Sequence, residues 1–277
     1  MKILRPFLRV TAFIILTMFT QIGGVVYVLA LFLFQYITKH SENAATRFLL
    51  KISTLLLLYL AATFFIVPPL AKVFGRERLP LTETNHLRPL NILTCILNRN
   101  YVRPTLKQAA YNVAAEMNKK YPGTIVNYLD GCFPFINNFP LVPHLSHNDG
   151  RKLDLAFCYI ENNNNQPSNN APSFIGYGIS EEPRVGEENT ALDCEEKGFW
   201  QYSLLKKLVP QTRKKNFTFD STRTAMLVNL FIAQPAIGKI FIEPHLKTRL
   251  HLTSDKIRFH GCRAVRHDDH IHVQLSN

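Results

Sequence analysis

The sequence has few acidic residues and no closely spaced pair of cysteines. Its 277 residues carry 20 Asp and Glu against 32 Lys and Arg, and its five cysteines form no CxxC motif. The missing motif argues against a four-cysteine zinc site and a thioredoxin-like redox site. Glycine (12) and proline (16) are too scarce for a collagen-like or low-complexity chain, and 47% apolar residues exclude a disordered one. The net charge of +12 indicates an anionic partner: nucleic acid, lipid headgroups or a cell-wall polymer.

Apolar residues concentrate near the N-terminus. Only Arg9 is charged between residues 7 and 37, and only Lys51 between 48 and 70. Since about 20 apolar helical residues cross a bilayer core, both runs predict transmembrane helices. We therefore expect a two-helix membrane anchor over residues 1–74, with membrane lipid as its partner.

The first apolar run begins like a signal peptide but does not end like one. It continues well past Gly23 and Gly24, which favours retention over cleavage. The two glycines leave open a break of this run into a re-entrant hairpin.

Basic residues lie on both sides of this anchor. Residues 1–78 hold nine Lys and Arg against two acidic residues, a net +7, and the remainder of the chain has +5. More than half of the excess is therefore juxtamembrane and suits anionic lipid headgroups. The basic segment 214–223 lacks a recognised fold motif, so we expect no nucleic-acid partner. Read literally, the positive-inside rule places both ends of a two-helix anchor in the cytoplasm.

The rest of the chain mixes short helices and strands without regular βαβ alternation. Three prolines in 75–104 predict a linker, which leaves 105–277 as the second domain. Periodicity predicts helices and strands at the following ranges: helices at 105–121, 224–234 and 244–252; strands at 124–130, 152–160, 239–243 and the C-terminus. The acidic segment 181–196 predicts a solvated loop. The fold class is therefore α+β, a small antiparallel sheet with flanking helices.

Five of the ten histidines cluster near two of these strands. His144 and His147 lie just before the strand that contains Asp154. Alternation puts Asp154 on the face opposite Leu153 and Leu155, where a part-buried carboxylate needs a cation, a metal or several hydrogen-bond donors. The alternative is that Asp154 is a surface-facing residue on an edge strand.

His267, His270 and His272 lie together near the C-terminus. His270 and His272 differ by two, so they project from one face of the last strand, opposite Asp269. One histidine and one aspartate from the first unit plus one histidine from the last strand give three ligands. Three protein ligands with an open fourth position are typical of a catalytic zinc site.

HLSHNDGRKLD (144–154) together with HDDHIH (267–272) resembles the penicillin-insensitive murein endopeptidases. These belong with the lysostaphin-type, D-Ala-D-Ala-type and hedgehog-type zinc domains. The shared pattern is His, six residues, Asp and a late HxH, with glycine (here Gly150) three residues after the first ligand. Leu145 and Lys152 depart from the carboxypeptidase branch and weaken that assignment. The two-helix anchor departs from the soluble periplasmic members.

The resemblance implies a role for each matching residue. Zn²⁺ would be held by His147, Asp154 and His272. His270 would act beside the metal as general base or oxyanion stabiliser, and His144 and His267 would complete the histidine ring. The D-Ala-D-Ala branch uses a Glu where this chain has Asp269, but strand parity points Asp269 away from His272, so we prefer His270 unless a β-bulge intervenes.

The implied activity is that of a zinc metallopeptidase, a hydrolase of peptidoglycan peptide stems, in the bacterial inner membrane with an extracytoplasmic peptidase domain. Two alternatives remain: a non-catalytic, membrane-tethered zinc module for binding or signalling, and a D-Ala-D-Ala carboxypeptidase. The sequence does not indicate an oligomeric state.

The cysteines leave several possibilities open. Cys158 or Cys262 could be a ligand, a buried apolar residue or half of a disulfide. Cys132 and Cys194 could pair if the domain is extracytoplasmic.

Overall fold

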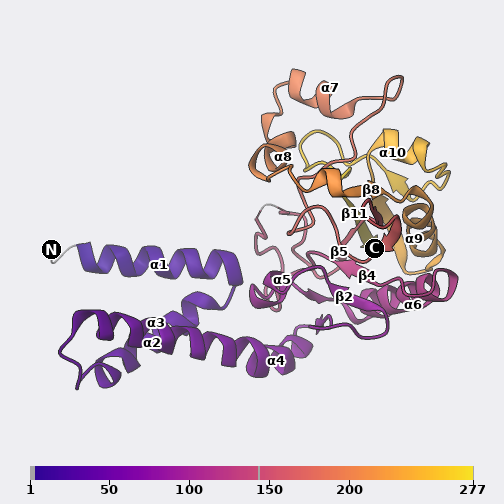
Figure 1. The fold of residues 1–277 in the computed structure, drawn as a ribbon. Helices are drawn as coiled ribbons and strands as arrows, with labels where there is room; N and C mark the ends of the chain where they lie inside the picture. The colour runs from indigo at the N-terminus through magenta and orange to yellow at the C-terminus, as the bar shows by residue number, and fades with distance from the viewer. Residues whose placement is uncertain (1–3, 143, 277) are drawn as a thin grey trace.

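The computed structural model describes residues 4–142 and 144–276, which form a helical arm and an α+β domain (Figure 1). In Figure 1 the arm lies to one side of the domain, and α1 begins at the end of the arm far from it. The arm consists of these elements: α1 (Leu4–Thr20), α2 (Gly23–Ile37), α3 (Ala44–Ala61), the π-helical turn η1 (Ala62–Ile66) and α4 (Val67–Val73).

One helix among the described residues, Ala44–Val73, is long and apolar enough to cross a membrane. The prediction of two such helices is therefore wrong. The first apolar run folds into α1 and α2, of 17 and 15 residues, and each falls short of the roughly 20 residues that a bilayer core requires.

The break between α1 and α2 lies at Gly23 and Gly24, the two glycines at which the sequence allowed a hairpin. Gln21 has a positive φ of 65°, and the Gly23 N–H donates to Thr20 Oγ1 at 2.8 Å. A Cβ on Gly24 would lie 2.0 Å from Thr17 Oγ1, so only glycine allows α2 to fold back this closely on α1. The first apolar run is therefore a helical hairpin, in which the start of α1 and the end of α2 lie at the same end of the arm.

The domain is built on a six-stranded mixed sheet of order β10-β9-β11-β5-β4-β2. It is not the antiparallel sheet expected, because the outer pairs β10–β9 and β2–β4 are parallel. The strands are β2 (Leu87–Pro89), β4 (Val126–Tyr128), β5 (Lys152–Ala156), β9 (Ile237–Phe241), β10 (Ile257–Arg258) and β11 (His270–Leu275). The α+β class is confirmed.

One face of this sheet packs against two helices, α6 (Pro104–Lys120) and α9 (Ser221–Ala233), to form the main core. Proline at the first turn suits the start of α6, where no intrahelical N–H is needed. Helical spacing then buries one face of α6, and alternation brings every second residue of β5 and β11 to the same core. The residues that meet there include Leu106, Ala110, Val113, Met117, Leu153, Leu155, Ile271 and Val273.

Residues 75–104 are part of the domain, not the linker that their prolines suggested. They contain β1 (Glu77–Arg78), β2, α5 (Leu93–Ile96) and β3 (Tyr101–Val102). The prolines are tolerated because Pro89 ends the edge strand β2 and Pro104 begins a helix.

Besides the two-stranded β1-β3 sheet, a three-stranded sheet of order β7-β6-β8 and several short helices lie in the C-terminal half. The predicted strand 152–160 ends early, since Tyr159 begins β6 in this other sheet. The acidic segment contains a helix, α7, where a solvated loop was expected. The remaining elements are β6 (Tyr159–Glu161), β7 (Gln166–Ser168), α7 (Thr190–Glu196), η2 (Trp200–Ser203), α8 (Leu204–Leu208), η3 (Lys214–Asn216), β8 (Phe217–Phe219) and α10 (Pro244–Arg249).

Candidate metal centre

The central pair of strands, β5 and β11, sets out the site. The two strands are antiparallel, with His272 opposite Asp154 and His270 opposite Ala156. Because side chains alternate along a strand, these polar residues share the face that the core does not use. The strand parity read from the sequence is therefore correct, and the one register shift of β11, at Gln274, lies beyond both histidines.

Three donor atoms meet at this face. His272 Nδ1 lies 2.9 Å from Asp154 Oδ1 and 3.0 Å from His147 Nε2. His147 Nε2 lies 3.1 Å from the same Asp154 oxygen. The three side chains are buried, and they come from the loop before β5, from β5 and from β11.

Hydrogen bonds alone do not satisfy this triangle. His147 Nδ1 lies 2.7 Å from the carbonyl oxygen of Gly131, so in the neutral tautomer Nδ1 carries the proton and Nε2 presents a lone pair. The proton on His272 Nδ1 can be shared with the other two atoms. His147 Nε2 and the Asp154 oxygen then face each other as two acceptors at 3.1 Å, which a cation between them would relieve.

The donor set is one that could hold a metal ion. Bonds of 2.0–2.2 Å in a tetrahedron place ligand atoms about 3.3 Å apart, close to the edges of this triangle. The group of His147, Asp154 and His272 has the geometry to hold a metal ion. The Gly131 carbonyl supplies the outer hydrogen bond that fixes a ligating histidine.

The second oxygen of Asp154 binds a different set of residues. Tyr177 donates its hydroxyl to Oδ2 at 2.9 Å, and His144 Nδ1 lies 3.3 Å from the same atom. His144 Nδ1 is equally close to Asp130, which Arg99 binds at 2.8 Å. Asp154 is therefore held from both oxygens, and its orientation is fixed.

His270 is oriented by its neighbour Asp269. The Asp269 carboxylate contacts His270 Nδ1 and accepts a hydrogen bond from the backbone N–H of Gly178. This contact leaves Nε2 of His270 turned toward Asp154, 3.7 Å from Oδ2. Asp269 is thus engaged with His270 and with the Gly178 backbone.

The charges of the cluster are strongly coupled. Burial raises the pKa of Asp154, but His147, His270 and His272 outweigh burial and hold its pKa well below the usual value. Burial lowers the pKa of His272 to about 3, which keeps its ring neutral and able to ligate. His270 differs: burial lowers its pKa, yet Asp154 and Asp269 raise it to about 9.

A cleft of about 430 Å³ opens beside the cluster. Burial, and then the neighbouring His270 and His272, hold the pKa of His267 well below its usual value. Within the described part of the chain, no hydrogen-bond partner faces Nε2 of three buried histidines: His144, His270 and His272. The cleft is lined by all six predicted residues, His144, His147, Asp154, His267, His270 and His272, and also by the exposed His260.

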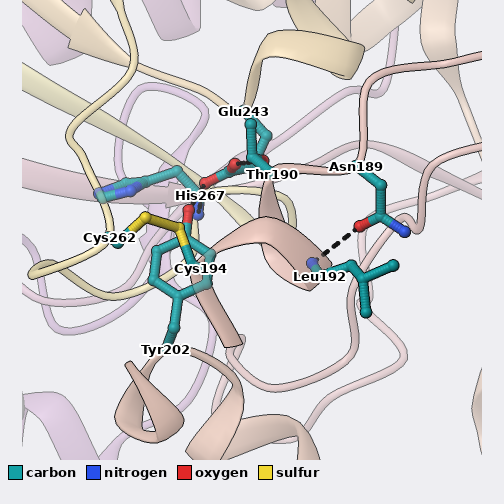
Figure 2. Close-up of a disulfide and its surroundings, with 8 residues drawn as sticks. All are labelled: Asn189, Thr190, Leu192, Cys194, Tyr202, Glu243, Cys262 and His267. Carbon is teal, nitrogen blue, oxygen red and sulfur yellow. Dashed lines mark hydrogen bonds between the residues drawn. A yellow bond between two sulfur atoms is a disulfide. The ribbon is translucent and has the colours of Figure 1, made fainter. Parts of the chain in front are cut away.

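A disulfide closes the loop that carries His260 and His267. Cys194 of α7 is bonded to Cys262, as Figure 2 shows. Beside it, Glu243 accepts hydrogen bonds from the Tyr202 hydroxyl at 2.5 Å and from the His267 backbone N–H at 3.0 Å. The buried Glu243 therefore fixes the loop to the sheet.

This pairing decides among the cysteine hypotheses. The suggested Cys132–Cys194 bridge is wrong, because Cys132 remains a buried thiol. Cys262 is half of a disulfide and is not a ligand. Cys158 lies beyond the end of β5 and packs against the main core.

Sequence reasoning missed Tyr177 and Asp130, which hold Asp154 and His144 in place. Tyr177 lies in a loop with no periodic pattern, although Gly176 and Gly178, both at positive φ, are a signal of a tightly specified turn. Asp130 ends the expected strand 124–130, and a charge at the end of a buried strand was the available signal.

All six residues selected from the sequence surround one cleft. Neither protein-family models nor curated proteins match the chain. The chemistry of the cluster is therefore inferred from its donor atoms and their geometry.

Proposed function

We propose that the protein is a membrane-anchored zinc metallopeptidase that hydrolyses peptide cross-links of peptidoglycan. The observation that carries the proposal is the triangle of His147, Asp154 and His272 donor atoms, 2.9–3.1 Å apart, at the wall of a cleft. Its sequence pattern also resembles the murein endopeptidases.

The three donors would hold the metal and leave a coordination position toward the cleft. Zinc, when bound there, lowers the pKa of water to about 7 and polarises a carbonyl. Asp154 contributes the negative charge of the ligand set, and Gly131 and Tyr177 keep His147 and Asp154 in ligating orientation.

His270 is the general base or oxyanion stabiliser of this mechanism. Its Nδ1 is occupied by Asp269, so Nε2 is the atom that accepts a proton from the attacking water or steadies the charge on the attacked carbonyl. His144 and His267 line the same cleft and would contact the peptide.

We further propose that the domain is extracytoplasmic, where peptidoglycan lies. Disulfides such as Cys194–Cys262 persist in oxidising compartments. The α1–α2 hairpin returns the chain to its starting side before Ala44–Val73 crosses, so a cytoplasmic N-terminus and an outer domain are compatible.

With this topology, the distribution of basic residues around the helix no longer argues strongly against an extracytoplasmic domain. Arg76 lies just after the helix, where a basic residue opposes an outer domain, but it is fully buried and donates to the Phe133 carbonyl and to Asn137. Arg78 donates to the Phe64 carbonyl. These two arginines serve the fold, which leaves the exposed Lys72 as the basic residue at the outer end of the helix, against Lys39, Arg47 and Lys51 at the inner end.

Digestion of purified sacculi tests the function. The detergent-solubilised full chain with one equivalent of zinc should release soluble fragments, and His270→Ala should keep the zinc but lose the release. His251→Asn is the matched control, because His251 is exposed and its positive φ suits Asn. Zinc bound at one equivalent without release would favour the non-catalytic module. If metal-free protein released as many soluble fragments as the zinc-loaded protein, the mechanism would be contradicted.

A further inference from the structure

The transmembrane helix holds the domain by contacts inside its own apolar stretch. Tyr59 donates its hydroxyl to the Ile96 carbonyl of α5 at 2.5 Å, and Asn98 donates to Thr63 Oγ1 at 3.2 Å. At the tip of the hairpin, the Phe135 N–H donates to Gln21 Oε1 at 2.8 Å. The arm and the domain are therefore joined by these hydrogen bonds, and also by Arg78 of β1, which donates to the Phe64 carbonyl.

These joints lie at the depth of a bilayer. The hydrocarbon core is about 30 Å thick, which is about 20 helical residues, so it ends near residue 67 if counted from Arg47 and near 71 if counted from Lys51. Tyr59 and Thr63 come before either limit. The edge of the domain that carries α5 is consequently at the level of the outer leaflet.

The free side of the helix supports this depth. Phe65 and Val73 are 78% and 82% exposed, and Ile66 and Leu70 are also exposed. Large apolar side chains exposed together on one helix mark a contact surface, and lipid around them would remove their apolar area from water. The bilayer therefore extends along the helix to the region where the domain begins.

The domain edge at this level is also apolar. Leu93 and Ile175 line one cavity, and Asn91 donates to the Phe174 carbonyl at 3.0 Å, so α5 and the loop at 174 are neighbours. Leu205 lines both this cavity and the metal cleft, whose wall includes Leu145. The exposed apolar side chains of this edge form what we call the apolar rim: Ile92, Leu93, Ile136, Leu145, Phe174 and Ile175.

Charge is scarce at the rim: the cavity that Leu93 and Ile175 line also holds Arg99 and Asp130, and these two residues form an ion pair at 2.8 Å. The segments that carry the rim, 91–97, 133–148 and 172–179, contain no Asp, Glu, Lys or Arg in a chain that is 19% charged. In Figure 1, α5 lies on the side of the domain that faces the arm. Exposed apolar patches of this kind mark membrane or protein contacts, and the joints to the helix favour the membrane.

We propose that the apolar rim is seated in the outer leaflet of the lipid bilayer. The metal cleft, which shares Leu145 with the rim, then opens at the membrane surface. This inference rests on the proposed insertion of the arm, and it adds that the domain itself contacts lipid.

Tryptophan quenching by acyl-brominated phosphatidylcholine tests the proposal in vesicles that contain the full chain. Trp200 is the single tryptophan, so Trp200→Phe provides a dark background. Into this background go Leu93→Trp and Phe174→Trp in the rim, Phe65→Trp in the arm as the positive control, and the fully exposed Val185→Trp as the negative control.

We expect both rim variants to lose most of their emission in brominated vesicles, as Phe65→Trp does, while Val185→Trp keeps its emission. Rim variants as bright as Val185→Trp beside a quenched Phe65→Trp would overturn the rim proposal alone, and a blue-shifted rim emission that reverts on protein dilution would identify a second copy as the occupant. An unquenched Phe65→Trp would overturn the insertion of the arm and the rim with it.

Discussion

Asp154 is the residue on which the candidate site depends. It is fully buried, and each of its two oxygens has its own partners: His147 and His272 on Oδ1, and Tyr177 and His144 on Oδ2. A buried carboxylate among histidines is stable only if it is paired. The outer partners should therefore influence the metal as well as the fold.

Tyr177→Phe removes the hydroxyl that donates to Asp154 and that accepts from the Asp130 N–H at 3.2 Å. Loss of such an outer contact costs about 10- to 100-fold in metal affinity. We expect a weaker zinc Kd of this size in chelator competition, with the fold retained. Tyr111→Phe, a partly buried tyrosine of α6, is the control and should leave the Kd unchanged. Equal affinities for both variants would contradict the role of Tyr177.

Asp269→Asn tests the positioning of His270. The carboxylate favours the charged ring and raises the pKa of His270, so its removal lowers that pKa. A base with a lower pKa becomes neutral at lower pH, and the acidic limb of the pH–rate profile should move to lower pH while zinc content stays at one equivalent. A lower rate with an unmoved profile would mean that Asp269 serves only the fold.

At the scale of elements, β5 and β11 carry the site and the disulfide closes it. The bond between α7 and the loop of His260 joins residues 68 apart in sequence. Without the bond, that loop is held by Glu243 and by the contacts of its own side chains. The Cys194–Cys262 disulfide therefore affects both the position of the loop at the cleft and the stability of the domain.

Cys262→Ser should lower the free energy of unfolding by about 2–4 kcal/mol, since the cross-link restricts the unfolded chain. Thermal unfolding of the zinc-loaded protein measures the loss. Cys158→Ser is the control for the removal of a thiol that is not in a disulfide. A Tm equal to that of the parent chain would show that the bond contributes nothing.

The regular elements at the site could be predicted from the sequence because alternation reports directly on the two faces of a strand. Leu153 and Leu155 reach the core and Asp154 the cleft, as their parity predicts. Tyr177 could not be predicted in this way, because loops place side chains through turns and distant contacts that leave no period. The pairing of Cys194 with Cys262 was equally out of reach, since it depends on how α7 folds over the sheet.

At the scale of the whole molecule, the arm and the domain pack together as one unit. The arm and β3 share a small core that includes Ile22, Val67 and Tyr101, in addition to the polar joints. Orientation in the membrane therefore determines which compartment the cleft can reach.

Cysteine labelling in intact cells tests this orientation with a membrane-impermeant maleimide. Val185→Cys, on the exposed surface of the domain, should react at once, whereas Ser41→Cys, between α2 and α3, should react only after permeabilisation. The parent chain is the control for its own thiols. The reverse pattern would place the domain in the cytoplasm and remove peptidoglycan as its substrate.

The central claim is that His147, Asp154 and His272 hold one zinc ion. Metal content of the purified full chain and its variants, measured by mass spectrometry after dialysis, tests it most directly. We predict one equivalent of zinc in the parent chain and in His270→Ala, and almost none in His147→Ala or His272→Ala. A parent chain without metal, or a His147→Ala protein that retains its full equivalent, would contradict the claim.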